Sequence, residues 1–182
     1  KSNIVNPCGT TWPSKISEKK ISQLEQDVDK LIQVSGFSNG PINIEARINK
    51  EGKAFIMEIG PRSGGHFVPQ AIKYGTGFDM VKAILDSLTS RKIIVTNNNN
   101  HSSAYYALHS DDEGVLKSIV FKKELKPYIK EFHQYIHPGE KVYSFQGANA
   151  AIGVLLLLFS SQEEMDYYID NMNKFVEIQL EA

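Results

Sequence analysis

Two glutamates and an arginine stand at a spacing that suits metal-dependent phosphoryl chemistry. Glu45 and Glu58 flank a Glu51-Gly52 dipeptide, and Arg62 follows shortly after the second glutamate. Mg²⁺ takes carboxylate oxygens from proteins, usually together with substrate phosphates. An arginine beside them would stabilise negative charge on a transferring phosphoryl group. The stretch 43–66 is therefore the candidate site of this chain.

These residues need a β-hairpin to meet. A turn at Glu51-Gly52 would set Glu45 opposite Glu58 and Asn43 opposite Gly60. The other face would then be apolar, which is what a buried face requires. Its predicted pairs are Ile44 with Ile59, Ala46 with Met57, and Ile48 with Phe55.

Facing carboxylates repel each other, by about 4 kcal/mol at ~4 Å and an effective dielectric constant of about 20. A divalent cation between Glu45 and Glu58 would remove that repulsion. The alternative is a solvated sheet face in which Arg47 supplies the counter-charge.

The segment after the hairpin favours a metal site over a solvated sheet face. Pro61-Arg62-Ser63-Gly64-Gly65 brings a cation and flexible backbone N–H groups beyond Glu58, and a helix is predicted to begin near Phe67. Helix N-termini attract anions. His66 is either a hydrogen-bonded turn residue or a substrate contact.

This stretch resembles the last catalytic segment of ATP-grasp enzymes, which are ATP-dependent carboxylate–amine or carboxylate–thiol ligases and their carboxylase relatives. In that family a Glu on one strand is followed by Glu-x-Asn-x-Arg on the next. Glu45 and Glu58 match the two metal-binding glutamates, and Arg62 matches the arginine near the transferred phosphate. The family's Asn falls at Gly60, which is a departure. Gly64-Gly65-His66 is more similar to the ligases that join amino acids than to the biotin carboxylases.

The resemblance implies a role for each residue. Glu45 and Glu58 would hold Mg²⁺ or Mn²⁺ on the phosphates of ATP, with Asn43 completing the metal shell in place of the missing Asn. Arg62 would be the catalytic charge stabiliser. The cofactor-binding and acceptor-binding turn would comprise Ser63, Gly64, Gly65 and His66. The substrates would be ATP, a small carboxylate and an amine.

Composition narrows the class of protein. The 182 residues carry a formal net charge of -1, which gives no electrostatic case for nucleic acid or for an anionic membrane. The apolar run 153–159 is too short to span a bilayer, which needs ~20 residues. The single cysteine, Cys8, excludes an internal disulfide and fits the cytoplasm.

The remaining pattern predicts an α+β fold: the C-terminal half of an ATP-grasp fold, an antiparallel sheet with helices, followed by a small α+β subdomain. We expect domains at 1–98 and 99–182, divided at the asparagine run 97–100. Helices are predicted at 17–35, 67–74, 79–88, 125–130 and 161–173. Besides the hairpin, strands are predicted at 91–96, 103–109, 115–121, 134–136, 141–145, 150–159 and 176–180, with 103–109 and 115–121 forming a pair.

Too few residues precede Gly36 to form the lobe that carries the phosphate-binding lysines in ATP-grasp enzymes. The chain begins with Lys1 rather than Met, so we expect part of a longer enzyme whose N-terminal lobe is missing here, inactive alone. A non-catalytic binding or interaction module with the same fold is the alternative, which Gly60 favours. A free-standing metal-dependent hydrolase ranks last because no general base is evident. The sequence leaves open whether the protein forms a homodimer.

Overall fold

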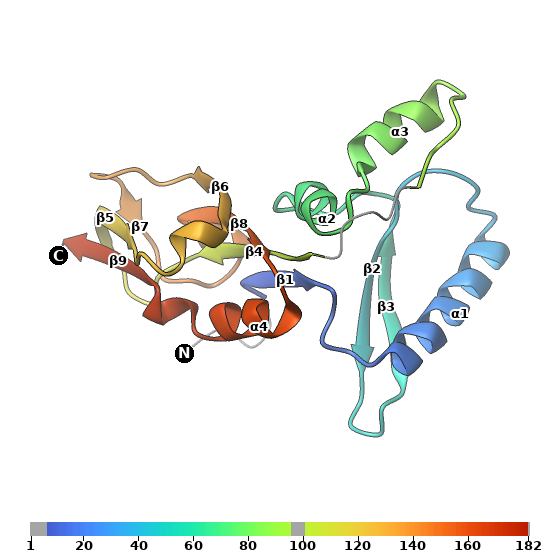
Figure 1. Ribbon diagram of the computed structural model, residues 1–182, viewed down its shortest axis with the longest axis horizontal. Helices are drawn as coiled ribbons and strands as arrows, with labels where there is room; N and C mark the ends of the chain where they lie inside the picture. Colours follow the sequence, from blue (N-terminus) through green and yellow to red (C-terminus); the bar gives the residue numbers. More distant parts are fainter. Residues whose placement is uncertain (1–6, 96–100, 182) are drawn as a thin grey trace. The chain divides into compact units, whose positions relative to one another are not determined.

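A computed structural model describes residues 7–95 and 101–181 of the chain (Figure 1). Contacts between Cα atoms divide these residues into two compact units. Residues 14–65 and 79–95 form one, which we call the hairpin unit. Residues 7–13, 66–78 and 101–181 form the other, the sheet unit.

The hairpin unit consists of two helices and a two-stranded antiparallel sheet. Its elements are α1 (Glu18–Ser35), β2 (Asn43–Ile48), β3 (Ala54–Gly60) and α3 (Met80–Leu88). Helix α1 begins after Ser17 and ends at Gly36, whose φ of 69° gives the left-handed cap that glycine adopts without a Cβ penalty. Asp79 caps α3 by accepting the backbone N–H of Lys82.

The hairpin unit buries very little of its apolar surface. Ala54 and Asp86 are its only buried residues, and α1 contains none. Several large apolar side chains are instead exposed on α1, on β3 and on and after α3: Val34, Met57, Leu85, Leu88, Ile94 and Val95. An isolated two-stranded hairpin is marginally stable at best, so this unit depends on what packs against its hairpin. The large apolar side chains of this unit therefore remain mostly on its surface.

The sheet unit contains two antiparallel sheets. The first has the strand order β1-β4-β8-β6, and the second has the order β7-β5-β9. The bounds of the strands are β1 Gly9–Trp12, β4 Ser102–Leu108, β5 Gly114–Phe121, β6 Ile129–Gln134, β7 Lys141–Val142, β8 Gly153–Phe159 and β9 Val176–Glu181. Its α-helices are α2 (Val68–Thr76) and α4 (Gln162–Asp170), with 3₁₀ turns at Lys126–Tyr128, Ala148–Ala150 and Met172–Lys174.

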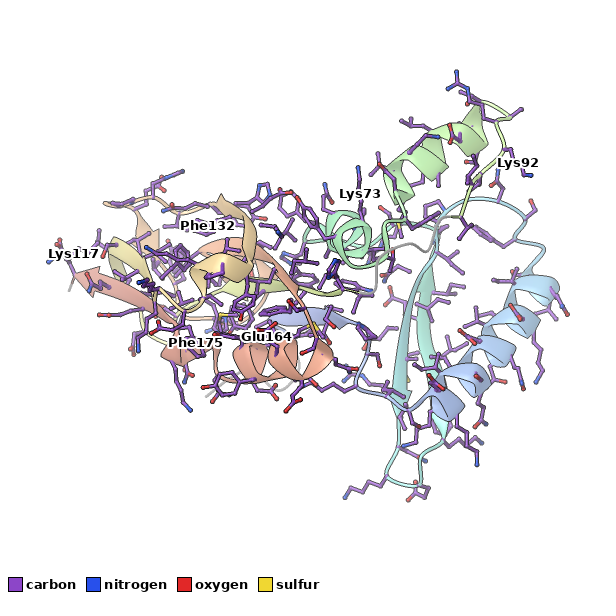
Figure 2. All side chains as sticks on the ribbon, in the orientation of Figure 1. Lys73, Lys92, Lys117, Phe132, Glu164 and Phe175 are labelled. Atoms are coloured by element: carbon purple, nitrogen blue, oxygen red, sulfur yellow. The ribbon has the colours of Figure 1, made fainter. Side chains whose placement is uncertain are left out.

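The core of the sheet unit lies on both faces of the first sheet. Alternate residues of a strand point to opposite faces. Leu155, Leu157 and Phe159 of β8 join Met165 of α4 in the larger cluster, and Phe132 and Phe175 pack against it (Figure 2). On the other face Tyr105, Val154 and Leu156 join Ala71 of α2. The apolar run of β8 is buried on both sides, as expected for a central strand.

Gly75 lies inside α2, which continues to Thr76, beyond its predicted end. A Cβ on Gly75 would lie 2.5 Å from Oγ of Ser103, whose hydroxyl donates to the backbone oxygen of Ala71 at 2.8 Å. Glycine is therefore a packing requirement here rather than a helix stop. The helix ends instead at Gly77, with φ 75°.

Four secondary-structure predictions were wrong. The helix predicted at 125–130 is only a 3₁₀ turn at Lys126–Tyr128, and the next residues belong to β6. Residues 91–95 form no strand. The strands predicted around 103–109 and 115–121 exist as β4 and β5, but they do not pair: β4 lies between β1 and β8, and β5 lies between β7 and β9. The strand predicted at 134–136 is β6, which starts earlier, at Ile129, directly after the 3₁₀ turn. Local pattern marked most of the strands but carried no information on their partners.

The two units are not two contiguous segments of chain. Strand β1 pairs with β4, and α2 packs on β4 and β8, so both contribute to the sheet unit although they precede the predicted boundary. The asparagine run 97–100 lies outside the described residues. Within residues 7–95 and 101–181, no helix has the length and apolar character needed to cross a membrane.

Candidate functional site

The β2–β3 hairpin places the two predicted metal-binding glutamates side by side. Glu45 pairs directly with Glu58, and Asn43 pairs with Gly60. Residues that pair directly in an antiparallel ladder share one face, so all four positions lie on the same side of the hairpin. Glu45 and Glu58 are both exposed on it. The prediction that the glutamates face each other is confirmed.

The predicted turn and two of the three predicted apolar pairs were wrong. The loop runs through Asn49: the N–H of Gly52 donates to the oxygen of Asn49 at 2.9 Å, and Asn49 in turn pairs with Lys53. Gly52 takes the left-handed φ of 84° that closes a longer turn of this kind. Ala46 consequently pairs with Ile56 rather than Met57, and Ile48 pairs with Ala54 rather than Phe55.

A β-bulge then restores the register at the site. The pairing shifts by one residue between Glu45 and Ala46, which leaves Met57 as the extra residue of β3. One extra residue at the turn and one at the bulge cancel, so the glutamates face each other as though the hairpin were regular. Bulges often occur next to functional sites, where they re-aim side chains.

Arg47 forms an ion pair with one member of the glutamate pair. Its Nη2 and Nε donate to Oε1 of Glu45 at 2.8 Å and 3.2 Å. Both side chains are more than half exposed, so solvent screens this ion pair. No described residue forms a hydrogen bond or ion pair with the Glu58 carboxylate. The counter-charge proposed as the alternative to a metal thus exists, but it engages one glutamate only.

Arg62 lies against the site face. Its backbone N–H donates to the oxygen of Gly60 at 2.8 Å, which curls the chain back after β3. A Cβ built on Gly60 would lie 3.6 Å from both Cγ and Nε of Arg62. Because position 60 shares its face with Glu58, the arginine side chain lies on the side that carries the glutamates. The structure therefore gathers Asn43, Glu45, Glu58 and Arg62 on one face.

The glycine turn passes from one unit to the other. Ser63, Gly64 and Gly65 belong to the hairpin unit, whereas His66 belongs to the sheet unit. Gly64 has a left-handed φ of 87°, and nothing lies within 4 Å of a Cβ built on Gly65. The His66 ring stacks on Tyr105 of β4 with ring centroids 5.6 Å apart. His66 is thus a packed turn residue in the sheet unit.

A polar cluster in the sheet unit was missed by the sequence analysis. Oε2 of Glu131 lies 2.6 Å from Nε2 of His133, and the hydroxyl of Tyr74 donates to Oε1 of Glu131. The Tyr74 bond, supported by His133, holds the pKa of Glu131 below its ordinary value, and the same bond raises the pKa of Tyr74. The sequence signal for this cluster was the Glu-x-His spacing of Glu131 and His133, which puts both side chains on one face of a strand. It was overlooked because β6 was predicted too late in the chain.

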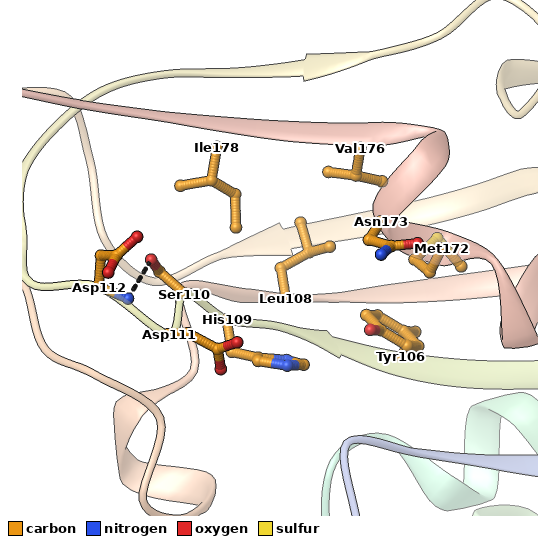
Figure 3. Close-up of a pocket in the computed structure, with 10 residues that line it drawn as sticks. All are labelled: Tyr106, Leu108, His109, Ser110, Asp111, Asp112, Met172, Asn173, Val176 and Ile178. Atoms are coloured by element: carbon orange, nitrogen blue, oxygen red, sulfur yellow. Dashed lines mark hydrogen bonds between the residues drawn. The ribbon is translucent and has the colours of Figure 1, made fainter. Parts of the chain in front are cut away.

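The sheet unit also has a pocket of about 300 Å³ between the end of β4 and β9 (Figure 3). Two polar side chains that line the pocket form hydrogen bonds to nearby backbone groups. Nδ1 of His109 lies 2.8 Å from the oxygen of Ala107, and the N–H of Asp112 donates to Oγ of Ser110 at 3.0 Å. Burial raises the pKa of Tyr106, which lines the same wall.

No protein-family model matches the sequence. One curated relative, the uncharacterized protein y4rH of Sinorhizobium fredii, is 20% identical over 161 residues, which is 87% of this chain and 34% of that protein.

Comparison with solved structures decides the fold. Phosphoribosylglycinamide synthetase from Anaerococcus prevotii superposes with a TM-score of 0.81 at 20% identity over 97% of this chain. L-amino acid ligase from Bacillus licheniformis gives 0.83 at 19% identity over 98%. N5-carboxyaminoimidazole synthetase from Staphylococcus aureus complexed with ADP gives 0.61 at 18% identity over 91%. The chain has the fold of the C-terminal part of an ATP-grasp enzyme.

The ATP-grasp fold confirms the predicted α+β class. The chain spans 46% of the first of these structures, 47% of the second and 42% of the third, so it corresponds to about half of an ATP-grasp enzyme.

The residues present are compatible with a divalent cation but do not enclose one. Among the described residues, no group of three or more His, Cys, Asp or Glu side chains is arranged to hold a metal ion. Two carboxylates on an open face match the mode in which Mg²⁺ binds through one or two carboxylates and fills its shell with phosphate oxygens and water.

Proposed function

We propose that the chain is the C-terminal part of an ATP-grasp ligase that activates a carboxylate as an acyl phosphate with Mg-ATP and joins it to an amine. The observation that carries the proposal is the facing pair Glu45–Glu58 with Arg62 against the same face. The ATP-grasp fold supports it, since the structures of this fold include a phosphoribosylglycinamide synthetase and an L-amino acid ligase.

Each residue would act through its charge or its backbone. Glu45, Glu58 and Asn43 would hold Mg²⁺ or Mn²⁺, which supplies charge neutralisation between the β- and γ-phosphates. Arg62 would stabilise the charge on the phosphoryl group during transfer and on the tetrahedral intermediate that follows. Backbone N–H groups of Ser63, Gly64 and Gly65 would hold the acceptor carboxylate, with His66 beside them.

The hairpin unit supports the need for a further lobe. Its exposed apolar side chains and nearly absent core are what a layer shows when its covering partner is elsewhere. We propose that the partner is the N-terminal lobe of the same enzyme, which would bring the other half of the ATP site. The single cysteine fits a cytoplasmic location.

The test is ATP-dependent phosphate release by the full-length protein. Candidate carboxylates and amines are supplied together and singly, and phosphate is measured with and without Mg²⁺. Release that requires both substrates and the cation supports the ligase. Release that requires neither substrate would indicate an ATPase or a hydrolase instead.

A non-catalytic binding module is the second candidate. Gly60 in place of the family's Asn and the Arg47–Glu45 ion pair favour it, because both weaken a metal site. A full-length protein that binds Mg-ATP and a carboxylate but releases no phosphate would support this candidate.

A further inference from the structure

The turn that leads into α2 has an unusual backbone. His66 and Phe67 adopt left-handed φ values of 49° and 61° in succession. Residues with a side chain rarely adopt this region, because the Cβ approaches the following carbonyl oxygen. Two such residues in a row need surrounding contacts to hold them there. The turn follows directly on the Ser63–Gly65 segment, at the point where the chain enters the sheet unit.

Ring contacts hold both residues. His66 stacks on Tyr105, and Phe67 stacks on His133 of β6 with ring centroids 4.0 Å apart and an angle of 15° between the planes. The second contact is the tighter one. A stacked aromatic pair can shift the equilibrium between the ordered and the released conformation of the turn by up to about tenfold.

The Phe67 contact is braced by a polar chain. His133 is held through Nε2 by Glu131, and Glu131 accepts the hydroxyl hydrogen bond of Tyr74. Tyr74 lies on α2, the helix that Phe67 begins. The four residues therefore close a ring of contacts from the start of α2 to β6 and back to α2. We call this ring the α2 clasp.

The clasp is not a core contact. The side chains of Glu131 and His133 are each about one-third exposed, at 33% and 34%. The low pKa of Glu131 keeps it an anion that accepts from both partners. A directional chain of this kind fixes the orientation of the His133 ring, which apolar packing alone does not do.

We propose that His133, braced by Glu131, is a positioning residue for the acceptor turn: by holding Phe67 in its left-handed conformation, it fixes the end of the Ser63–Gly65 segment whose N–H groups bind the acceptor carboxylate. The proposal rests on the proposed function. His133 acts through Phe67 and does not contact the reacting atoms.

Limited trypsin digestion tests the structural half of the proposal. The Arg62–Ser63 bond lies next to the turn, and the bonds after Lys50 and Lys53 at the hairpin tip serve as internal controls. His133→Ala should raise cleavage at Arg62–Ser63 about tenfold and leave cleavage at the tip unchanged. His133→Phe, which keeps a ring against Phe67, should restore most of the protection. Tyr128→Phe is the matched control, because it removes a Tyr–Glu hydrogen bond, to Glu164, elsewhere in the same unit.

Steady-state kinetics of the full-length enzyme test the functional half. His133→Ala and Glu131→Gln should raise the KM for the acceptor about tenfold and leave the KM for ATP within about twofold, whereas Tyr128→Phe should change neither. Unchanged cleavage at Arg62–Ser63 in His133→Ala overturns the proposal even if the enzyme is an active ligase. Faster cleavage with an unchanged acceptor KM also overturns it, as does an equal loss of affinity for ATP. Faster cleavage in a protein with no ligase activity overturns the proposed function and leaves the clasp a purely structural feature.

Discussion

Arg47→Gln should strengthen divalent-cation binding at the glutamate pair. The guanidinium occupies Oε1 of Glu45 through two hydrogen bonds, so it competes with a cation that binds through this oxygen. An exposed ion pair of this type contributes about 0.2–1 kcal/mol. Removing it should therefore tighten binding by about 1.4- to 5-fold.

The assay is a titration of the chain with Mn²⁺, followed by electron paramagnetic resonance, at two salt concentrations. The gain should shrink at high salt, because screening already weakens the ion pair there. Lys30→Gln is the matched control: it removes one positive charge and the ion pair with Asp27 on α1 of the same unit. If Arg47→Gln binds Mn²⁺ no more tightly than Lys30→Gln, Arg47 does not compete with a metal and the reasoning is refuted.

Three further predictions concern the packing around the site. Gly60→Asn should fold normally and bind Mn²⁺ more tightly, because the nearest atoms to the added Cβ are at an ordinary 3.6 Å; a fall in melting temperature or unchanged Mn²⁺ affinity would contradict this. The folded-state pKa of Glu131 is lowered, so its bond to Tyr74 contributes stability above the ordinary pKa of 4.5 that is lost as the pH falls through the folded-state pKa. The destabilisation by Tyr74→Phe, measured by urea denaturation, should therefore be largest near neutral pH and shrink in acid; a pH-independent effect would contradict this. Gly75→Ala should destabilise the chain by about 1–3 kcal/mol through its clash with Ser103, and a Ser103→Ala background should reduce the loss; equal losses in both backgrounds would point to another cause.

The sequence predicted the pairing of the two glutamates better than it predicted the fold around them. The Glu45–Glu58 pairing followed from the alternation of apolar residues, and it survived because the longer turn and the bulge displaced the register in opposite directions. Neither feature was foreseen. Glu51-Gly52 resembled a two-residue turn, yet Asn49 offered a side-chain acceptor for the Lys53 N–H and Gly52 a left-handed residue, which together favour the longer loop.

The partners of the strands could not be predicted because they are set by distant packing. β4 and β5 are neighbours in sequence, but burial of β8 on both faces draws β4 to it, and β5 enters a different sheet. Gly75 shows the same limit on a smaller scale. The segment Gly75-Thr76-Gly77 predicts the end of the helix, and only the approach of Ser103, 28 positions later in the numbering, explains why a glycine is needed at position 75.

The most direct test of the account is Glu58→Gln in the full-length protein. The change keeps the size and the hairpin position of the side chain but replaces a carboxylate by an amide that binds Mg²⁺ far more weakly. The measurement is phosphate release that depends on ATP, carboxylate and amine, paired with a melting curve in metal-free buffer.

The account predicts that Glu58→Gln nearly abolishes phosphate release while the melting temperature stays the same or rises slightly, because the repulsion with Glu45 is relieved. Full activity in Glu58→Gln would contradict the metal role. Loss of activity together with a large fall in melting temperature in metal-free buffer would show instead that Glu58 is a structural residue.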